Sequence, residues 1–207
     1  MPKFDTCFFE RYAQITLCDL FGERYAGLVN LDRPDLQDLN KGIGIEVTRA
    51  MEENKKAAQA LLSEMAGNVH DVTSEAYKDI QSSGYAYGLH TGNWLGDKEY
   101  TYWQLALPLK RIIANKVRKV ASGFYGEFET FGLYIFSKDD VSETQVKATI
   151  AFTRQLQRQH ATRYSILFLS EIQTLYACDL RTGHFTTHPI SPAKRKNYYN
   201  RALQAEF

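Results

Sequence analysis

Residues 34–48 read Pro-Asp-Leu-Gln-Asp-Leu-Asn-Lys-Gly-Ile-Gly-Ile-Glu-Val-Thr, and this stretch sets the expectation for the fold. From Ile43 onward, apolar residues alternate with other types, which is the period of a strand that turns one face to the core. Glu46 and Thr48 therefore point to the same side of that strand. A carboxylate in the middle of an apolar strand is costly to bury unless it is paired, hydrogen-bonded or bound to a metal.

Asp35 is expected to lie beside Glu46. It begins the extended segment before the strand, and residues 40–42, Asn-Lys-Gly, can turn the chain back on itself. The two carboxylates would then be neighbours on adjacent strands. Two converging carboxylates form a hard-oxygen site, so Mg²⁺ or Mn²⁺ is the cofactor that we predict.

A purely structural explanation of the two acids stays open. Asp35 could be an ordinary turn residue, and Glu46 could pair with Arg33 or Arg49 on the surface of the sheet. Their joint occurrence favours a site. Gly44 adds to this interpretation, because a residue without a side chain leaves room beside Glu46 for a ligand or another backbone segment.

The order of these residues resembles the PD-(D/E)xK nuclease superfamily. In that family a Pro-Asp opens one strand and a Glu-x-Lys lies on the next, within an α-β-β-β-α-β core. Residues 34–35 match the first half of the motif, and residues 46–48 match the second half except that threonine stands in place of lysine. The resemblance implies a restriction endonuclease-like α/β fold and metal-dependent hydrolysis of DNA phosphodiester bonds. It assigns Asp35, Glu46 and the backbone carbonyl of Val47 to the metal.

The lysine that is missing at Thr48 has to be sought elsewhere, since in some members of the superfamily it comes from a neighbouring helix. The pattern predicts an amphipathic helix over residues 105–121, and Lys116 falls within its apolar stripe, four residues after Ile112. A lysine in that position either snorkels to the surface or meets a carboxylate. Lys116 is therefore the preferred catalytic lysine, and Lys55 is the second choice.

A first helix is expected over residues 5–21, and Glu10 lies on its line of Leu17 and Phe21. Several branches of the superfamily contribute an acid from this helix to the metal site, so the resemblance adds Glu10 to the candidate metal ligands. A solvated helix charge, or a partner for Arg11, is an equally simple explanation of the same residue.

The rest of the pattern predicts one α/β domain over residues 1–207 with a mixed sheet and C-terminal extensions. Further helices are expected over 48–65, 71–82 and 142–160, and strands over 25–31, 131–137, 164–169, 174–179 and 185–189. Ser142 and Gln145 have the spacing of a capping box at the start of a helix. A segment at about 67–104 is interpreted as an insertion into the core.

The composition narrows the class of protein. The chain has 207 residues, is 44% hydrophobic and carries a formal net charge of +1. We expect neither a secretory signal nor a membrane span, and three scattered cysteines indicate free thiols in a reducing compartment, so the predicted location is the cytoplasm without a membrane partner. No Ser-His-Asp set and no phosphate-binding glycine loop is recognisable in the sequence.

Basic residues gather in two parts of the chain, the predicted helix over 105–121 and the C-terminal tail, where aromatic residues are interleaved with them. The residues that we assign to nucleic-acid contacts are Lys110, Arg111, Lys119, Lys194, Arg195 and Lys196. Such clusters suit phosphate contacts and base stacking, so DNA is the predicted partner and RNA the alternative. A solvated helix face and a soluble tail are the commoner meaning of such runs.

Two other functions stay open at this point. Thr48 favours a degenerate nuclease fold that binds nucleic acid or a protein without cutting. The Tyr/Trp-rich segment 83–104 favours an interaction module, for example a phage-defence or counter-defence component, because Tyr and Trp are the usual anchors of protein-binding surfaces. For the nuclease, phage defence or mobile-element biology is the expected setting. The resemblance also allows a homodimer, since nucleases of this type often pair to cut two strands.

Overall fold

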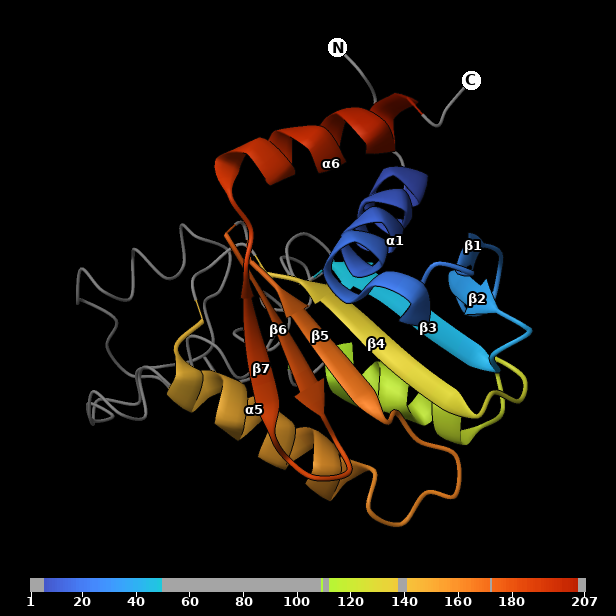
Figure 1. The fold of residues 1–207 in the computed structure, drawn as a ribbon. Coiled ribbons are helices and arrows are strands. Elements are labelled where there is room, and N and C mark those ends of the chain that lie inside the picture. The colour runs from blue at the N-terminus through green and yellow to red at the C-terminus, as the bar shows by residue number, and fades with distance from the viewer. Residues whose placement is uncertain (1–5, 50–108, 110–111, 138–140, 172, 205–207) are drawn as a thin grey trace, which may run out of the picture.

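The computed structural model describes residues 6–49, 109, 112–137, 141–171 and 173–204, and these form an α/β protein built on one mixed sheet (Figure 1). The strands of the sheet are β1 (Val29–Asn30), β2 (Leu36–Asp38), β3 (Ile43–Arg49), β4 (Thr130–Phe136), β5 (Ile166–Ser170), β6 (Thr174–Asp179) and β7 (Phe185–Pro189). The described helices are α1 (Thr6–Phe21), a 3-10 turn η1 (Gly22–Arg24), the helix over residues 112–121, α5 (Glu143–Leu156) and α6 (Pro192–Gln204).

The seven strands lie side by side in the order in which they occur in the chain. β3, β4 and β5 are parallel, whereas β1 and β2 on one side and β6 and β7 on the other add antiparallel neighbours. Parallel neighbours need crossover connections, and these contain the helix over 112–121 and α5. Two right-handed crossovers that advance in the same direction place both helices on the same face of the sheet.

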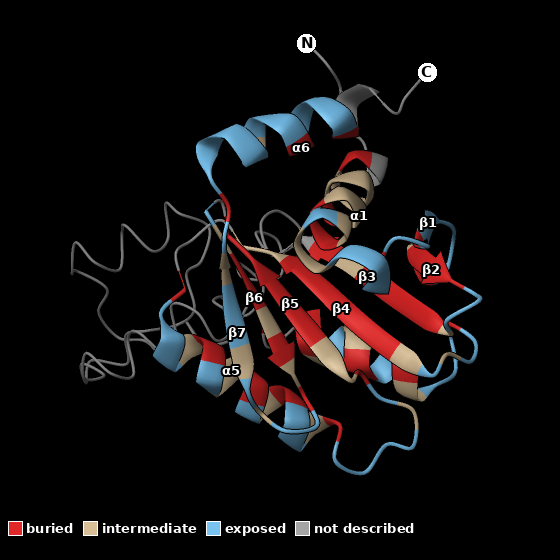
Figure 2. Cartoon of the chain, in the orientation of Figure 1, coloured by how far each residue is buried: buried red, intermediate tan, exposed pale blue. Residues whose placement is uncertain are grey.

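Each face of the sheet has its own hydrophobic core. The helix over 112–121 packs with Leu133, Ile135, Leu167 and Leu169 on one face, where α5 adds Val146 and Ile150. On the other face, Ala13 and Leu17 of α1 and Tyr198 of α6 pack with Ile43, Ile45, Tyr134 and Phe168. The central strands are therefore buried on both sides, as expected of parallel strands, while α6 keeps an exposed outer surface (Figure 2).

Most of the predicted elements are confirmed where the structure describes them. The strands expected at 174–179 and 185–189 have these bounds, and the capping box at Ser142 and Gln145 is present at the start of α5. The helix α5 ends at Leu156 rather than at residue 160. Its next residue, Gln157, uses its side chain amide to bond both the backbone N–H and the backbone C=O of Tyr164.

Two predicted boundaries are wrong. The helix expected to begin at Thr48 does not begin there, because Thr48 and Arg49 still belong to β3 and pair with Ile135 and Phe136 of β4. The strand expected over 25–31 is reduced to β1, since a 3-10 turn precedes it. The remainder of the helix expected to reach residue 65, the helix 71–82 and the insertion at about 67–104 lie outside the described residues. None of the described helices has the length and the apolar character that crossing a membrane requires.

Gly44 of β3 is required by close packing rather than by a ligand. A Cβ at this position would lie 2.8 Å from Cγ of Pro34 and 2.9 Å from Cγ of Phe128. The room that we expected beside Glu46 is therefore filled by two rings of the protein itself. This contact fixes the Pro34 segment, and with it the residue that follows, against the sheet.

We expect Gly44→Ala to lower the free energy of unfolding by about 1–3 kcal/mol, because rigid rings cannot yield to an added methyl group. Gly132→Ala is the matched control. Its Cβ would lie 3.0 Å from Cγ1 of Ile45 and 3.2 Å from Cγ2 of Ile166, so these neighbours need to move by only a few tenths of an ångström and the loss of stability should be smaller. Urea denaturation of both variants would measure the difference. Equal destabilisation of the two variants would contradict the packing of Pro34 and Phe128 described here.

Candidate active site

The hairpin of β2 and β3 brings Asp35 opposite Glu46. Leu36 pairs with Ile45 at the start of β2, so continuing the antiparallel register by one residue places Asp35 across from Glu46. Directly opposite residues project to the same face of a sheet. The turn is held by Asp38, whose Oδ1 accepts hydrogen bonds from the backbone N–H groups of residues 40 and 41, both at 3.1 Å.

The carboxylate of Asp35 takes the place of a missing strand partner. Its Oδ2 accepts a hydrogen bond of 2.7 Å from the backbone N–H of Val47. Because β2 begins only at Leu36, no residue of that strand reaches Val47. In an antiparallel ladder the N–H and C=O of one residue point to the same side, so the carbonyl of Val47 also faces the side of Asp35. Asp35 is thus more than a turn residue.

Lys116 meets Glu46. Its Nζ lies 2.5 Å from Oε1 of Glu46, across 70 residues of sequence. Both side chains are largely buried, with 18% of the lysine and 9% of the glutamate exposed. Of the two outcomes expected for a lysine on the apolar stripe, the structure has the contact with a carboxylate. The alternative in which Glu46 pairs with Arg33 on the surface of the sheet is not realised, because Arg33 pairs with Asp32 at 3.4 Å.

The pair of acids carries more negative charge than its surroundings stabilise. Burial, and next the negative charge of Glu46, raises the pKa of Asp35 to about 7, against the lowering effects of the Val47 N–H and of Lys116. Near neutral pH, Asp35 is therefore about half protonated. A cation between the carboxylates would favour the ionised form of Asp35.

Two buried tyrosines complete the surroundings of Glu46. Tyr125 is 3% exposed, and its hydroxyl lies beside Glu46 and Tyr164 without a hydrogen bond of good geometry to a residue of the described chain. Burial, followed by the charge of Glu46, raises the pKa of Tyr125, so this hydroxyl keeps its proton. The hydroxyl of Tyr164 donates to the carbonyl of Lys116 at 3.5 Å. Sequence reasoning missed both residues, since isolated tyrosines have no diagnostic spacing.

Glu10 lies on α1, which packs on the opposite face of the sheet from the helix that carries Lys116. It is half-buried, and its Oε2 accepts a hydrogen bond of 2.8 Å from Asn30. Its charge contributes to the raised pKa of Asp35, behind burial and Glu46. Among the described residues, no three His, Cys, Asp or Glu side chains are arranged to hold a metal ion. A cation would thus rest chiefly on Asp35 and Glu46.

The other predicted residues are spread over both faces. Thr48 is buried and lies on the Glu46 side of β3, whereas Lys119 is exposed and places its Nζ 5.0 Å from the centre of the Phe124 ring. Lys194, Arg195 and Lys196 belong to α6 on the opposite face, and Lys194 pairs with Asp19 at 2.6 Å. Lys55, Lys110 and Arg111 lie outside the described residues.

Comparison with known proteins returns no matching family model, no matching curated protein and no matching solved structure. The function is therefore argued from the chemistry of the site.

The raised pKa of Asp35 predicts how stability depends on pH. In the unfolded chain this carboxyl titrates near 4, so between about pH 4 and pH 7 the folded state binds more protons, and the free energy of unfolding falls as the pH rises. Asp35→Asn removes this dependence, while its amide oxygen can still accept from Val47. The free energy of unfolding of Asp35→Asn, minus that of the wild type, should therefore increase from about pH 4 to pH 7.

Urea denaturation at pH 4.5, 6 and 8 would measure this difference. Asp32→Asn is the control, because the Asp32 side chain is 86% exposed and its variant should follow the wild type at every pH. Parallel curves for Asp35→Asn and the wild type would refute the raised pKa.

Proposed function

We propose that this protein is a metal-dependent nuclease of the restriction endonuclease-like type that hydrolyses phosphodiester bonds of DNA. The contact between Lys116 and Glu46 carries the proposal, since it supplies an ammonium group where Thr48 cannot. The order of elements also supports it. Within the described part of the chain, α1, the strands β1 to β3, the helix over 112–121 and β4 occur in the order helix, three strands, helix and strand.

The oxygen atoms around Asp35 suit a small divalent cation. Asp35 and Glu46 offer carboxylates on one side of the hairpin, and the carbonyl of Val47 faces the same side. Mg²⁺ usually keeps several waters and binds one or two carboxylates together with phosphate, so this small set of protein ligands is sufficient. Burial, and next the charge of Glu46, raises the pKa of Asp35, and a cation bound between the two carboxylates would stabilise its ionised form.

When bound there, Mg²⁺ or Mn²⁺ would lower the pKa of a water molecule and neutralise charge on the phosphate. Lys116 would hold that water beside Glu46 and add positive charge where the phosphate becomes more negative. The hydroxyl of Tyr125, which lies beside Glu46 and Tyr164, could donate to the water or to a phosphate oxygen by turning toward it. Burial of these groups strengthens their electrostatic effects.

The non-cutting alternative rested on Thr48. The position of Lys116 weakens this argument, since an ammonium group reaches the acids from another element. An interaction module that uses residues 83–104 stays a prediction, because this segment lies outside the described residues. The experiments below measure Mn²⁺ binding and nucleic-acid cleavage separately, so they distinguish a nuclease from a protein that binds without cutting.

We expect isothermal titration to detect Mn²⁺ binding by the wild type and its loss in Asp35→Ala/Glu46→Ala. Since the cation competes with the proton on Asp35, the affinity should increase by roughly tenfold from pH 6 to pH 8. Asp32→Ala, a change of an exposed acid nearby, is the control and should bind Mn²⁺ as the wild type does. Equal binding by the double variant would exclude this site.

We expect Lys116→Gln to retain Mn²⁺ binding but to cut labelled DNA at least about 10²-fold more slowly, because a neutral amide cannot stabilise the developing charge. The amide can still donate to Glu46, which protects the fold. Lys147→Gln removes an exposed lysine of α5 and should cut normally.

Cleavage would be followed with single- and double-stranded DNA, and with RNA in parallel. Full activity of Lys116→Gln would remove the proposed role of Lys116. Mn²⁺ binding without cleavage of any of these substrates would establish the non-cutting alternative.

A further inference from the structure

A cavity of about 720 Å³ opens beside the candidate active site, at the end of α5 and the beginning of β4 and β5. It is lined by four arginines, Arg154, Arg158, Arg163 and Arg181, with Glu129 as the one carboxylate among its described lining residues. The volume is within the range of about 300–1,000 Å³ that is typical of ligand pockets. A concave surface of this composition concentrates positive potential and attracts anions.

The four arginines differ in whether other groups of the protein already contact their guanidinium groups. Arg154 donates from Nη2 to the carbonyl of Arg181 at 3.3 Å, and Gly183 leaves space for its guanidinium, since a Cβ there would be 2.5 Å from Nη1. Arg181 lies 3.7 Å from a carboxylate oxygen of Asp179. Arg158 and Arg163 are exposed and have no carboxylate partner among the residues that the structure describes. These two guanidinium groups are thus available to a ligand.

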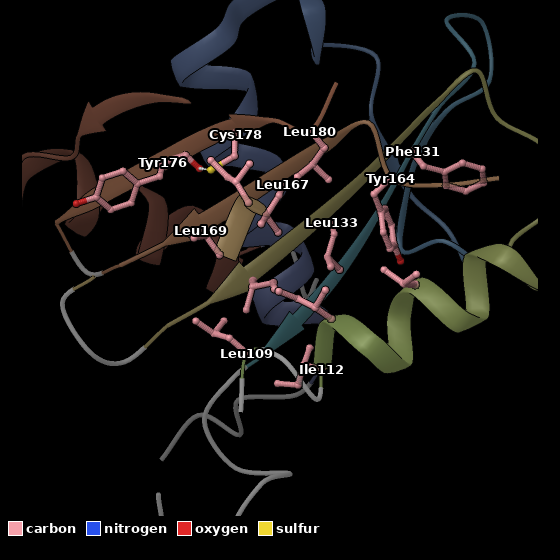
Figure 3. Packing of buried hydrophobic residues seen from close by; sticks show 14 of the residues in the cluster. Leu109, Ile112, Phe131, Leu133, Tyr164, Leu167, Leu169, Tyr176, Cys178 and Leu180 are labelled. Carbon is pink, nitrogen blue, oxygen red and sulfur yellow. Dashed lines mark hydrogen bonds between the residues drawn. The ribbon is translucent and has the colours of Figure 1, made fainter. Parts of the chain in front are cut away.

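Aromatic residues form a common wall between the cavity and the acids. Phe128 lines the cavity, and its ring contacts the position of Gly44 on β3 beside Pro34. Tyr164 also lines the cavity, and its hydroxyl reaches the carbonyl of Lys116. Figure 3 shows Tyr164 next to Phe131, with its hydroxyl directed toward the helix over 112–121. Phe128 and Tyr164 thus place the cavity and the acids next to each other on one face of the sheet.

We propose that this cavity is a phosphate-binding subsite that holds the backbone of a nucleic acid strand next to the bond that is cut. The inference rests on the proposed function and names the surface that recognises the substrate. Arginine suits this task, because its planar guanidinium binds phosphate oxygens through two parallel hydrogen bonds.

The two available guanidinium groups, Arg158 and Arg163, border a cavity of about 720 Å³, which is far larger than a single phosphate ion, so a chain of phosphates fits the cavity better. This surface also lies on the face that carries Lys116, whereas the basic residues of α6 lie on the other face.

The test measures binding of a fluorescein-labelled DNA oligonucleotide by anisotropy in EDTA, so that it depends on neither metal nor cleavage. We expect Arg158→Gln/Arg163→Gln to bind at least about tenfold more weakly, which corresponds to the loss of charged hydrogen bonds. The logarithm of the DNA association constant falls linearly with the logarithm of the salt concentration, and the magnitude of this slope should become smaller by roughly one for each arginine removed. Arg158→Lys/Arg163→Lys should restore the slope, because it restores the charges.

The matched control is Arg24→Gln/Arg201→Gln, which removes one exposed arginine from η1 and one from α6, neither of which lines the cavity. It should bind DNA as the wild type does. The proposal is overturned if this control loses affinity while the cavity variant does not, or if the wild type binds no DNA. It is also overturned if inorganic phosphate, but no oligonucleotide, binds in an arginine-dependent way, since the cavity would then serve a small anion.

The two proposals can fail separately. If DNA binding depends on the arginines but no DNA is cut in Mg²⁺ or Mn²⁺, the subsite proposal stands and the nuclease proposal fails. If the wild type cuts DNA but Arg158→Gln/Arg163→Gln binds DNA as tightly as the wild type does, the nuclease proposal stands and the subsite proposal fails. Circular dichroism of each variant would establish that it is folded.

Discussion

The burial of the Glu46 carboxylate in the centre of β3 constrains the surrounding structure. Transfer of a charge from water to the interior costs several kcal/mol, so a buried carboxylate needs a partner and further hydrogen-bond donors. Lys116 supplies the opposite charge from a helix that precedes β4. The pair thereby ties that helix to the sheet at a defined position. An apolar pair of similar volume would often be as stable, so stability alone does not explain why charges occupy this position.

The site lies where the regular pairing of the sheet ends. β3 continues to Arg49, whereas its neighbour β2 begins only at Leu36, so β2 does not pair with the second half of β3. Asp35 satisfies the backbone N–H of Val47 with its side chain. The same arrangement directs backbone and side-chain oxygens to one place. A short strand beside a longer one is thus the structural origin of a concentrated negative charge.

Negative and positive regions adjoin on this face. Burial, and next the charge of Glu46, raises the pKa of Asp35, and the arginine-lined cavity begins on the other side of Phe128 and Tyr164. A cation would be attracted to the first region and a phosphate chain to the second. Both faces of the sheet have a hydrophobic core. The face that packs against the helix over 112–121 also carries the two acids, Lys116 and the arginine-lined cavity.

Local patterns in the sequence determined the elements and the two acids. The alternation after Ile43, the turn before it and the capping box at Ser142 depend on neighbouring residues, so they could be predicted without the fold. The position of Lys116 within an apolar stripe indicated an inward lysine for the same reason.

Only the tertiary structure decided which groups meet. Lys116 contacts Glu46 across 70 residues, the Tyr125 hydroxyl lies beside the same carboxylate, and four arginines from three separate segments surround one cavity. Such contacts arise when distant segments pack together, and the periodicity of a single segment contains no information about them.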